Sequence, residues 1–227
     1  MNMLPQLAVF DIAGTTLHDE SNVGLVLRKT LVDAGVEVSL EEVNEVMGYA
    51  KPFAITHLLS IKKDPRAEEP ASIDTLHTRF VQDMITHYKT NENVREKSGT
   101  SDVFRALKQK GIKIALDTGF DRAITEVILQ RVGWTEQGLV DIVVTSDEVP
   151  HGRPYPYMIY RAMEQLGIRS IQDVMKIGDT ISDLEEGTNA GCKYVIGVTT
   201  GAYSRPELEK GPHTHLVAHL NEVLTLF

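Results

Sequence analysis

Short apolar runs recur along the chain at the length typical of buried strands. They are LAVFD (7–11), IKIALD (112–117), DIVVT (141–145), DVMKIGD (173–179) and KYVIGV (193–198). Between the later four runs, the segments DRAITEVILQRVGW, PYPYMIYRAMEQLG and DLEEGTNAG carry patterns typical of helices. In the first of these segments the apolar side chains keep helical spacing, at Ile124, Val127, Ile128 and Val132. Strands that alternate with such helices indicate the α/β fold class, with a parallel sheet covered on both faces.

The segment between residues 20 and 95 follows a different pattern. It contains four helical patterns, NVGLVLRKTLVDAG, LEEVNEVMG, PFAITHLLSI and IDTLHTRFVQDMITHY, and no convincing strand. The stretch KKDPRAEEP is expected to be a solvated loop within it. We therefore predict a helical cap over residues 19–94, inserted into an α/β core formed by residues 1–18 and 95–227. Because parallel sheets bind ligands at the carboxyl ends of their strands, a cap inserted at that edge would cover the site.

Composition and charge narrow the choice of partners. The 227 residues are 42% hydrophobic and carry a formal net charge of −9 with no basic run, which argues against nucleic acid but not against a small phosphorylated ligand. No apolar stretch approaches the ~20 residues of a transmembrane helix, and no basic segment followed by an apolar run marks a secretory signal. A cytoplasmic protein without a membrane partner is expected, and a homodimer is left open. Cys192 is the only cysteine, and we expect it to pack as a small hydrophobic side chain.

Three acidic residues are expected to meet at one edge of the sheet. Asp11 ends the first strand, and Asp179 and Asp183 flank the turn in KIGDTISD. Each has a structural explanation when taken alone, such as helix capping or stabilisation by a helix dipole. Together they would repel one another unless a cation is present. Mg²⁺ is the expected cation, because it prefers hard oxygen ligands and shares its coordination with phosphate.

A second set of groups at the same edge is suited to phosphate. Thr118 and Gly119 end the strand in LDTG, and Arg153 lies in HGRPYPYM after the next strand. A hydroxyl, a backbone N–H and a guanidinium are complementary to phosphate oxygens. A carboxylate beside them, such as Asp11, can attack phosphorus and form an aspartyl-phosphate. These residues therefore indicate phosphoryl transfer.

The motifs occur in a familiar order. DxxGTT, a strand-end Thr-Gly, a basic residue before PxP, and GDTxxD resemble the motifs of the haloacid dehalogenase superfamily over essentially the whole chain. The resemblance implies a Rossmann-like parallel core with an inserted helical cap. It also implies that Asp11 is the nucleophile. By the same resemblance, the Asp11 carboxylate, the Ala13 carbonyl and Asp179 hold Mg²⁺, with Asp183 in support.

Ala13 departs from the pattern of most phosphatases in this superfamily. They carry a second Asp there, which donates a proton to the leaving alkoxide, and an alanine cannot do so. The variant DxAGTT resembles the phosphonoacetaldehyde hydrolase branch, in which the leaving atom is carbon. In that branch a cap lysine shortly after Met-Gly condenses with the substrate aldehyde, and the resulting iminium accepts electrons. The segment VMGYAKPFAI places Met47, Gly48 and Lys51 in matching positions.

The position of Lys51 suits this chemistry. A lysine at a helix start is commonly a solvated charge. Here Pro52 is suited to the first helical position, which would place Lys51 near the N-cap. The helix dipole and burial under a cap would both lower the pKa of its amine. The neutral form needed for attack on an aldehyde would then be accessible.

Two positions differ from the phosphonatase pattern. The branch carries a His three residues after the lysine and a Tyr after the strand-end Thr-Gly, whereas this chain has Ala54 and Phe120. His57 lies six residues after the lysine, about 240° around a helix, so it cannot replace that imidazole. His18 is a weaker candidate and is expected to be an exposed loop residue. The PHTH segment at 212–215 lacks partners for a metal site.

Three functions remain open from the sequence. The first is a Mg²⁺-dependent hydrolase of the phosphonatase type that uses Lys51 on phosphonoacetaldehyde or a related phosphonate. The second is a phosphomonoesterase for a small phosphorylated metabolite, in which Lys51 is structural. The third is a non-enzymatic phosphate-sensing protein. Such a receiver-like protein would share the acids and a basic residue but would not need a four-helix cap.

Overall fold

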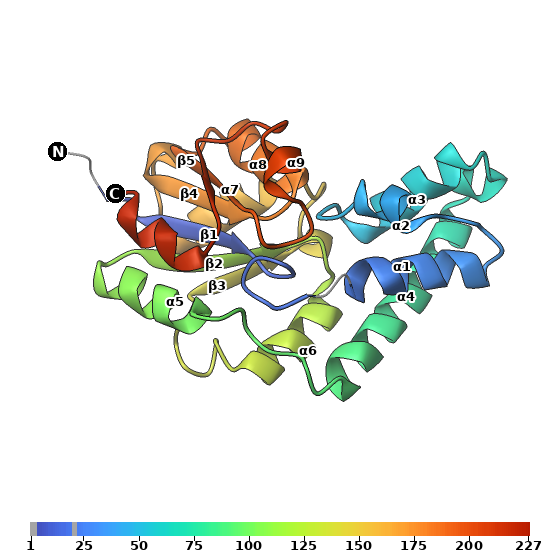
Figure 1. Ribbon diagram of the computed structural model, residues 1–227, viewed down its shortest axis with the longest axis horizontal. Helices are drawn as coiled ribbons and strands as arrows, with labels where there is room; N and C mark the ends of the chain where they lie inside the picture. Colours follow the sequence, from blue (N-terminus) through green and yellow to red (C-terminus); the bar gives the residue numbers. More distant parts are fainter. Residues whose placement is uncertain (1–3, 20–21) are drawn as a thin grey trace.

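The computed structural model describes residues 4–19 and 22–227, and within them the chain forms one parallel sheet. Its strand order is β3-β2-β1-β4-β5-β6, and every neighbouring pair is parallel (Figure 1). The strands are β1 (Leu7–Asp11), β2 (Lys113–Thr118), β3 (Ile142–Thr145), β4 (Val174–Gly178), β5 (Tyr194–Val198) and β6 (His215–Val217). The predicted α/β fold class is therefore confirmed. The edge strand β6 was not predicted, and it contains part of the PHTH segment.

Apolar side chains on both faces of β1 explain why it lies in the middle of the sheet. Ala8 and Phe10 belong to the larger hydrophobic core, which includes α5 (Thr100–Gln109) and α6 (Arg122–Val132). Leu7 and Val9 face the opposite way, into a second core with α7 (Tyr157–Leu166). The other α-helices of the described core are α8 (Ile181–Ala190) and α9 (Arg205–Leu208). A strand that is buried on both faces is typical of a parallel sheet.

The strand order places a natural binding crevice beside β1. Along the sheet, β2 lies on one side of β1 and β4 lies on the other, so the chain reverses its direction of winding between β1 and β4. Ligands of open α/β sheets bind outside the carboxyl ends of the strands at such a reversal. In the register of the sheet, Asp11 is paired with Asp117 at these ends.

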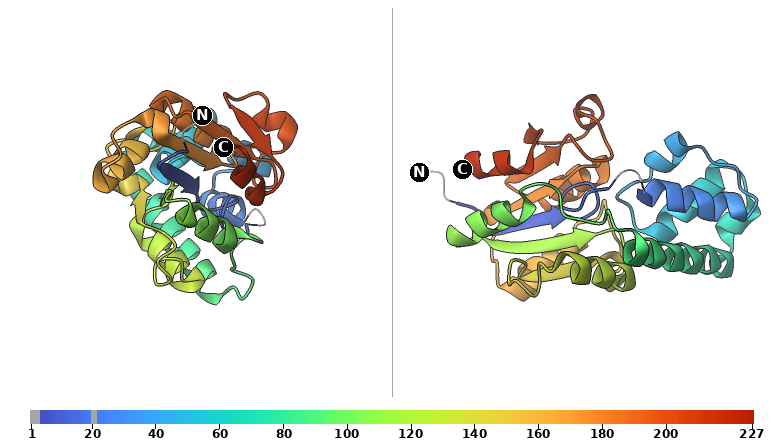
Figure 2. Two further views of the ribbon diagram at one scale, coloured as in Figure 1. Left: turned by 90° about the vertical axis from the view of Figure 1, so that its left-hand side faces the viewer. Right: turned by 60° about the horizontal axis from the view of Figure 1, so that its bottom comes forward.

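The four helices predicted between residues 22 and 90 are present and lie beyond the carboxyl ends of the strands (Figures 1 and 2). They are α1 (Asn22–Asp33), α2 (Leu40–Asn44), α3 (Lys51–Ile61) and α4 (Pro70–Thr90). The predicted loop KKDPRAEEP contains a short 3₁₀ helix, η1 (Pro65–Glu68). Pro65 suits the first position of this helix, and the Asp64 side chain accepts from the backbone N–H of Arg66.

The two segments that connect the cap to the core run alongside each other. The backbone N–H of His18 donates to Arg95 at 3.0 Å, and that of Lys97 donates to Thr16 at 2.8 Å. We propose residues 18 and 95 as the boundary between core and cap, because this pairing joins the two connections at one place. Of the predicted core and cap ranges, residues 1–3 and 20–21 lie outside the described part of the chain.

No helix in the described ranges is long and apolar enough to cross a membrane.

We predict that Phe104 is a principal support of the core. Its ring packs edge-on against Phe10 at 5.1 Å and against Trp134 at 5.6 Å between centroids, and all three side chains are fully buried. Phe104→Ala should lower the free energy of unfolding by about 3–5 kcal/mol, because it leaves a cavity. Urea denaturation measures this change. Leu25→Ala, at an exposed cap position, is the control and should shift stability by no more than about 0.5 kcal/mol.

Candidate active site

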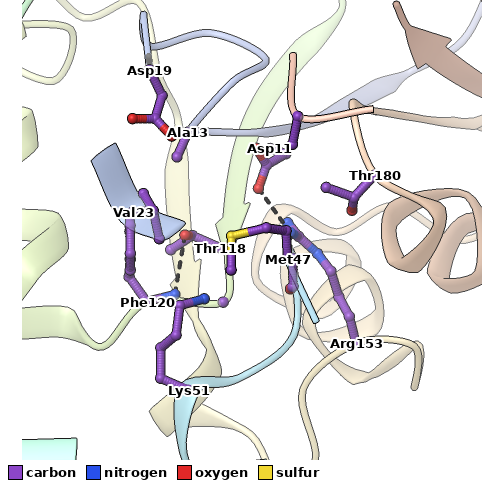
Figure 3. Close-up of a pocket in the computed structure, with 13 residues that line it drawn as sticks. Asp11, Ala13, Asp19, Val23, Met47, Lys51, Thr118, Phe120, Arg153 and Thr180 are labelled. Carbon is purple, nitrogen blue, oxygen red and sulfur yellow. Dashed lines mark hydrogen bonds and ion pairs between the residues drawn. The ribbon is translucent and has the colours of Figure 1, made fainter. Parts of the chain in front are cut away.

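Asp11 and Arg153 form an ion pair at the carboxyl end of β1. Arg153 Nη1 donates to Asp11 Oδ1 at 2.8 Å, as drawn in Figure 3. Asp11 is 5% exposed and the Arg153 side chain is fully buried. Arg153 also donates through Nη2 to the carbonyl of Asp117 at 3.0 Å and through Nε to Glu186 Oε2 at 3.1 Å. The guanidinium therefore connects β1, β2 and α8.

Lys176 is a second buried cation beside Arg153. Its Nζ lies 2.9 Å from Glu186 Oε2, 3.2 Å from Asp183 Oδ1, and in contact with Asp117 Oδ1. We call the set formed by Asp11, Asp117, Arg153, Lys176, Asp183 and Glu186 the strand-end charge cluster.

Sequence reasoning missed three members of the strand-end charge cluster. Signals for them exist: Asp117 precedes the predicted Thr-Gly, Lys176 interrupts an apolar strand, and Glu186 follows Asp183 by three residues on a helix. A charged side chain inside a buried strand needs a partner of opposite charge, so Lys176 itself points to buried acids.

Buried acids outnumber buried cations at this edge. Burial, then repulsion from Asp183, raises the pKa of Asp11 well above its usual value, and burial with the same neighbour raises the pKa of Asp179 to about 6. Burial and the nearby Asp117 raise the pKa of Glu186 to about 8. For Asp117 burial works in the same direction, but Arg153 and Lys176 outweigh it and lower the pKa. The excess negative charge calls for protons or for a further cation.

The donor set is suited to a divalent metal ion. Among the described residues, Asp11, Asp117 and Asp183 each offer an oxygen atom, and these atoms lie within 4.8 Å of one another. Asp117 Oδ2 is buried without a hydrogen bond, and Asp183 Oδ1 is buried with only the ion-pair contacts to Arg153 and Lys176. Carboxylate oxygens are the ligands that Mg²⁺ prefers. These residues therefore fit a hard cation.

Asp179 is held differently from the acids of that trio. Its Oδ1 accepts from the Thr15 hydroxyl at 2.8 Å and its Oδ2 from the backbone N–H of Ala202 at 2.6 Å. A Cβ atom at Gly14 or Gly201 would collide with its carboxylate. The loop with Gly14 and Thr15 and the loop with Gly201 and Ala202 therefore pack tightly around Asp179. Asp179 thus lies next to the loop that follows Asp11 but is not one of the three acids Asp11, Asp117 and Asp183.

A small pocket lies between the strand ends and the cap (Figure 3). Its volume is about 40 Å³, and it is lined by Asp11, Ala13, Asp19, Val23, Met47, Gly48, Lys51, Thr118, Gly119, Phe120, Arg153, Thr180 and Ala202. The pocket thus brings together all the predicted catalytic and phosphate-binding residues. Asp179 and Asp183 are not among the residues that line it. The Thr118 hydroxyl accepts from the backbone N–H of Phe120 at 3.2 Å, which fixes the turn at Gly119.

Lys51 is buried on the cap side of this pocket. It is 3% exposed and is the first residue of α3 rather than its N-cap, which is Ala50. Its Nζ donates to the carbonyl of Tyr49 at 3.0 Å and lies 5.3 Å from the centroid of the Phe120 ring. Burial, and then the positive charge of Arg153, lower the pKa of the amine to about 8. The neutral amine is therefore accessible close to neutral pH.

The other candidate histidines and the cysteine lie outside the pocket lining. His57 is exposed and stacks on Phe53 at 6.3 Å between centroids. His213 and His215 belong to the β6 region, where each ring meets a neighbouring oxygen at 2.9 Å. His18 is partly buried at the boundary between core and cap, not exposed as expected. Cys192 packs against the core, and burial raises the pKa of its thiol to about 12.

The family model for haloacid dehalogenase-like hydrolases matches residues 8–197. The chain belongs to this family and is a hydrolase, which removes the non-enzymatic phosphate sensor from the alternatives. It is 32% identical over 213 residues to a phosphonoacetaldehyde hydrolase of Bacillus cereus, covering 87% of this chain and 76% of that relative.

Solved structures show the same fold. A hydrolase from Pseudomonas syringae superposes with a TM-score of 0.85 at 17% identity, over 97% of each chain. A phosphonoacetaldehyde hydrolase-like protein from Oleispira antarctica superposes with a TM-score of 0.80 at 21% identity, over 99% of this chain and 94% of that one.

We predict that Gly119 controls how closely the cap approaches the core. A Cβ atom there would lie 2.6 Å from the carbonyl oxygen of Tyr49 and 2.7 Å from that of Gly48, and backbone atoms cannot yield easily. Gly119→Ala should displace the cap loop and lower kcat/KM for p-nitrophenyl phosphate by about 10²-fold, the effect of a ~1 Å misplacement.

The matched control for this prediction is Gly24→Ala in α1, where an added Cβ meets only ordinary contacts of 3.5 Å or more. It should retain full activity. Unchanged activity in Gly119→Ala would mean that the contact between the cap loop and β2 does not matter for turnover.

Proposed function

We propose that the chain is a Mg²⁺-dependent hydrolase of the phosphonatase type. Asp11 would form an aspartyl-phosphate, and Lys51 would assist cleavage of phosphonoacetaldehyde or a related phosphonate. The observation that carries this proposal is the buried amine of Lys51 in the same small pocket as the Asp11 carboxylate. The relationship to the phosphonoacetaldehyde hydrolase of Bacillus cereus supports it.

The core side of the pocket would bind the phosphoryl group. The Thr118 hydroxyl, the Gly119 backbone N–H and the Arg153 guanidinium would donate to its oxygens. Asp11, Asp179, Asp183 and the Ala13 carbonyl would hold Mg²⁺, which when bound would neutralise charge on the phosphoryl group. Arg153 already touches Asp11, so the same guanidinium can orient the carboxylate and the phosphoryl group.

The cap side of the pocket would activate the carbon. Neutral Lys51 attacks the aldehyde carbon, and loss of water from the adduct gives an iminium. The phosphorus–carbon bond then breaks as Asp11 attacks phosphorus, and the bonding electrons move into the iminium to give an enamine. Protonation and hydrolysis of the enamine release the aldehyde and free Lys51. Water hydrolyses the aspartyl-phosphate and restores Asp11.

The surroundings of Lys51 favour one second candidate function. Ala54 and Phe120 are both buried in the positions where the phosphonatase branch would have polar groups. The Lys51 ammonium has a carbonyl acceptor and an aromatic ring beside it, which is a sufficient structural role for a buried lysine. In this case the chain would hydrolyse a small phosphate monoester with Asp11 as nucleophile.

We predict a covalent adduct at Lys51. Borohydride added with phosphonoacetaldehyde should reduce the iminium to a secondary amine, which mass spectrometry locates on the Lys51 peptide. Because the pKa of Lys51 is about 8, the neutral fraction falls as the pH falls through 8, and the rate of adduct formation should fall about tenfold per pH unit below that value.

Lys51→Arg should abolish the adduct and phosphonate cleavage, because a guanidinium stays protonated at working pH. Lys62→Arg, at a partly exposed lysine paired with Glu42 on the same helical cap, is the control and should behave like the native protein. Intact ester hydrolysis by the native protein and by Lys51→Arg, with no adduct and no phosphonate cleavage in either, would favour the phosphomonoesterase.

We predict that Mg²⁺ affinity requires Asp11 and Asp179. Calorimetric titration of Asp11→Asn and Asp179→Asn should show affinity lower by at least about 10–100-fold, the loss caused even by residues that support a metal site indirectly. Asp102→Asn, at an exposed acid of α5, is the control. If Asp179→Asn binds normally while Asp117→Asn does not, the metal is held by the Asp11–Asp117–Asp183 trio instead.

A further inference from the structure

The proposed chemistry needs a proton donor that the recognised motifs do not supply. The position that holds an acid in most phosphatases of the superfamily is Ala13, and Ala54 and Phe120 bring no exchangeable proton to the cap side of the pocket. A leaving alkoxide or enamine carbon that is not protonated returns to phosphorus or stays bound. General acid catalysis of such a step accelerates it by about 10²–10⁴-fold.

Asp19 is the pocket residue that can supply this proton. Among the described residues that line the pocket, those with an ionisable side chain are Asp11, Asp19, Lys51 and Arg153. Asp11 is the nucleophile and Arg153 stays protonated. Lys51 is engaged with the aldehyde when a phosphonate is bound, and with an ester its Nζ donates to the carbonyl of Tyr49. In Figure 3 the Asp19 carboxylate points from the chain before α1 toward the side of the pocket where Ala13 lies.

The surroundings of Asp19 suit a group that cycles between acid and base. Its carboxylate accepts from the backbone N–H of Asn22 at 2.9 Å, which fixes its position at the start of α1. Burial raises the pKa of Asp19. The charged groups that interact electrostatically with its carboxylate are His87 of α4, Lys51 of α3 and Lys97 of the connecting segment.

A second cavity offers a route by which Asp19 can exchange protons. This cavity of about 30 Å³ also contacts Asp19 and is lined by His18, Asp19, Asn22, His87, Tyr88, Asn91, Asn93 and Val94. Asp19 is therefore shared by two cavities, one with the nucleophile and one with two imidazoles. The Tyr88 hydroxyl is fully buried without a hydrogen-bond partner, and its ring packs edge-on against Phe120 at 6.0 Å. An unpaired buried hydroxyl beside this acid is unfavourable unless a water or ligand group completes it.

We infer that Asp19 is a further catalytic residue, the acid that protonates the atom leaving phosphorus. This inference rests on the proposed function, because it requires transfer of the phosphoryl group to Asp11. With an ester, the phosphorus–oxygen bond breaks as Asp11 attacks, and the Asp19 proton passes to the leaving oxygen. With a phosphonate, the phosphorus–carbon bond breaks, the electrons form the enamine, and the Asp19 proton passes to its carbon. The Asp19 carboxylate then takes a proton from the water that hydrolyses the aspartyl-phosphate.

The test compares substrates whose leaving groups need protonation to different extents. Asp19→Asn should lower kcat/KM for propyl phosphate by about 10²–10⁴-fold. For p-nitrophenyl phosphate, whose leaving group departs as a stable anion, the loss should be less than about tenfold. Asp74→Asn, at an exposed acid of α4, is the control and should leave both substrates unaffected. Asp19→Asn keeps the size and the acceptor oxygen of the side chain, and an unchanged thermal midpoint shows that the variant is folded.

Phosphonoacetaldehyde provides the second arm of the test. In a quenched single turnover, Asp19→Asn should form the phosphorylated Asp11 faster than it releases acetaldehyde, because bond cleavage precedes the missing protonation. In the native protein the two should appear together.

The possible results separate the two proposals. An equal loss on both esters, or simultaneous appearance of both products in Asp19→Asn, would overturn the role of Asp19 and leave Asp11 as nucleophile. Turnover by Asp11→Asn would instead overturn the proposed function. If the native protein turns over none of the three probes, both the proposed function and the role of Asp19 are overturned.

Discussion

Charge neutralisation in the strand-end charge cluster is the constraint on which the rest of the site depends. Arg153 and Lys176 are surrounded by carboxylates from β1, β2 and α8, and their side chains are fully buried. Isolation of any of these charges would cost several kcal/mol, so the elements that carry them are held in one arrangement. Arg153 Nη1 also donates to the carbonyl of Gly48 in the cap loop at 3.4 Å. The same guanidinium therefore holds Asp11, the sheet and the cap loop relative to one another.

The central part of the fold was predictable because burial leaves a strong pattern. Strands β1 to β5 lie within about one residue of the predicted runs, since each is a short, largely apolar segment between polar turns. The last strand, β6, has three residues and contains a histidine, so no apolar run marks it. Helix α5 was not predicted either, because only a few apolar side chains, chiefly Val103, Phe104 and Leu107, anchor it to the core. The packing that stabilises this helix comes from segments distant in the sequence, including Phe10 and Trp134.

The site was predictable to the extent that topology alone determines proximity. Asp11, Thr118 and Arg153 were expected at one edge because they follow parallel strands, and they line the same pocket. Sequence does not report distances, so the separation of Asp179 from the trio of acids emerges only in three dimensions. Lys176 was overlooked because a lysine within an apolar run does not disturb the strand pattern. Asp19 lies in a connecting segment without a motif, and only folding brings it to the pocket.

The small volume of the pocket has a consequence for selectivity. About 40 Å³ is room for about three water molecules, whereas even phosphonoacetaldehyde has seven non-hydrogen atoms. We expect the contact between the cap loop and Gly119 to open before a ligand of this size enters, with the paired connections near residues 18 and 95 as the hinge. A molecule that prevents the contact from re-forming keeps water in the site and the cap lysine away from the core. We therefore expect ligands to be selected first by whether the cap can close over them, and only then by the bond that they offer for cleavage.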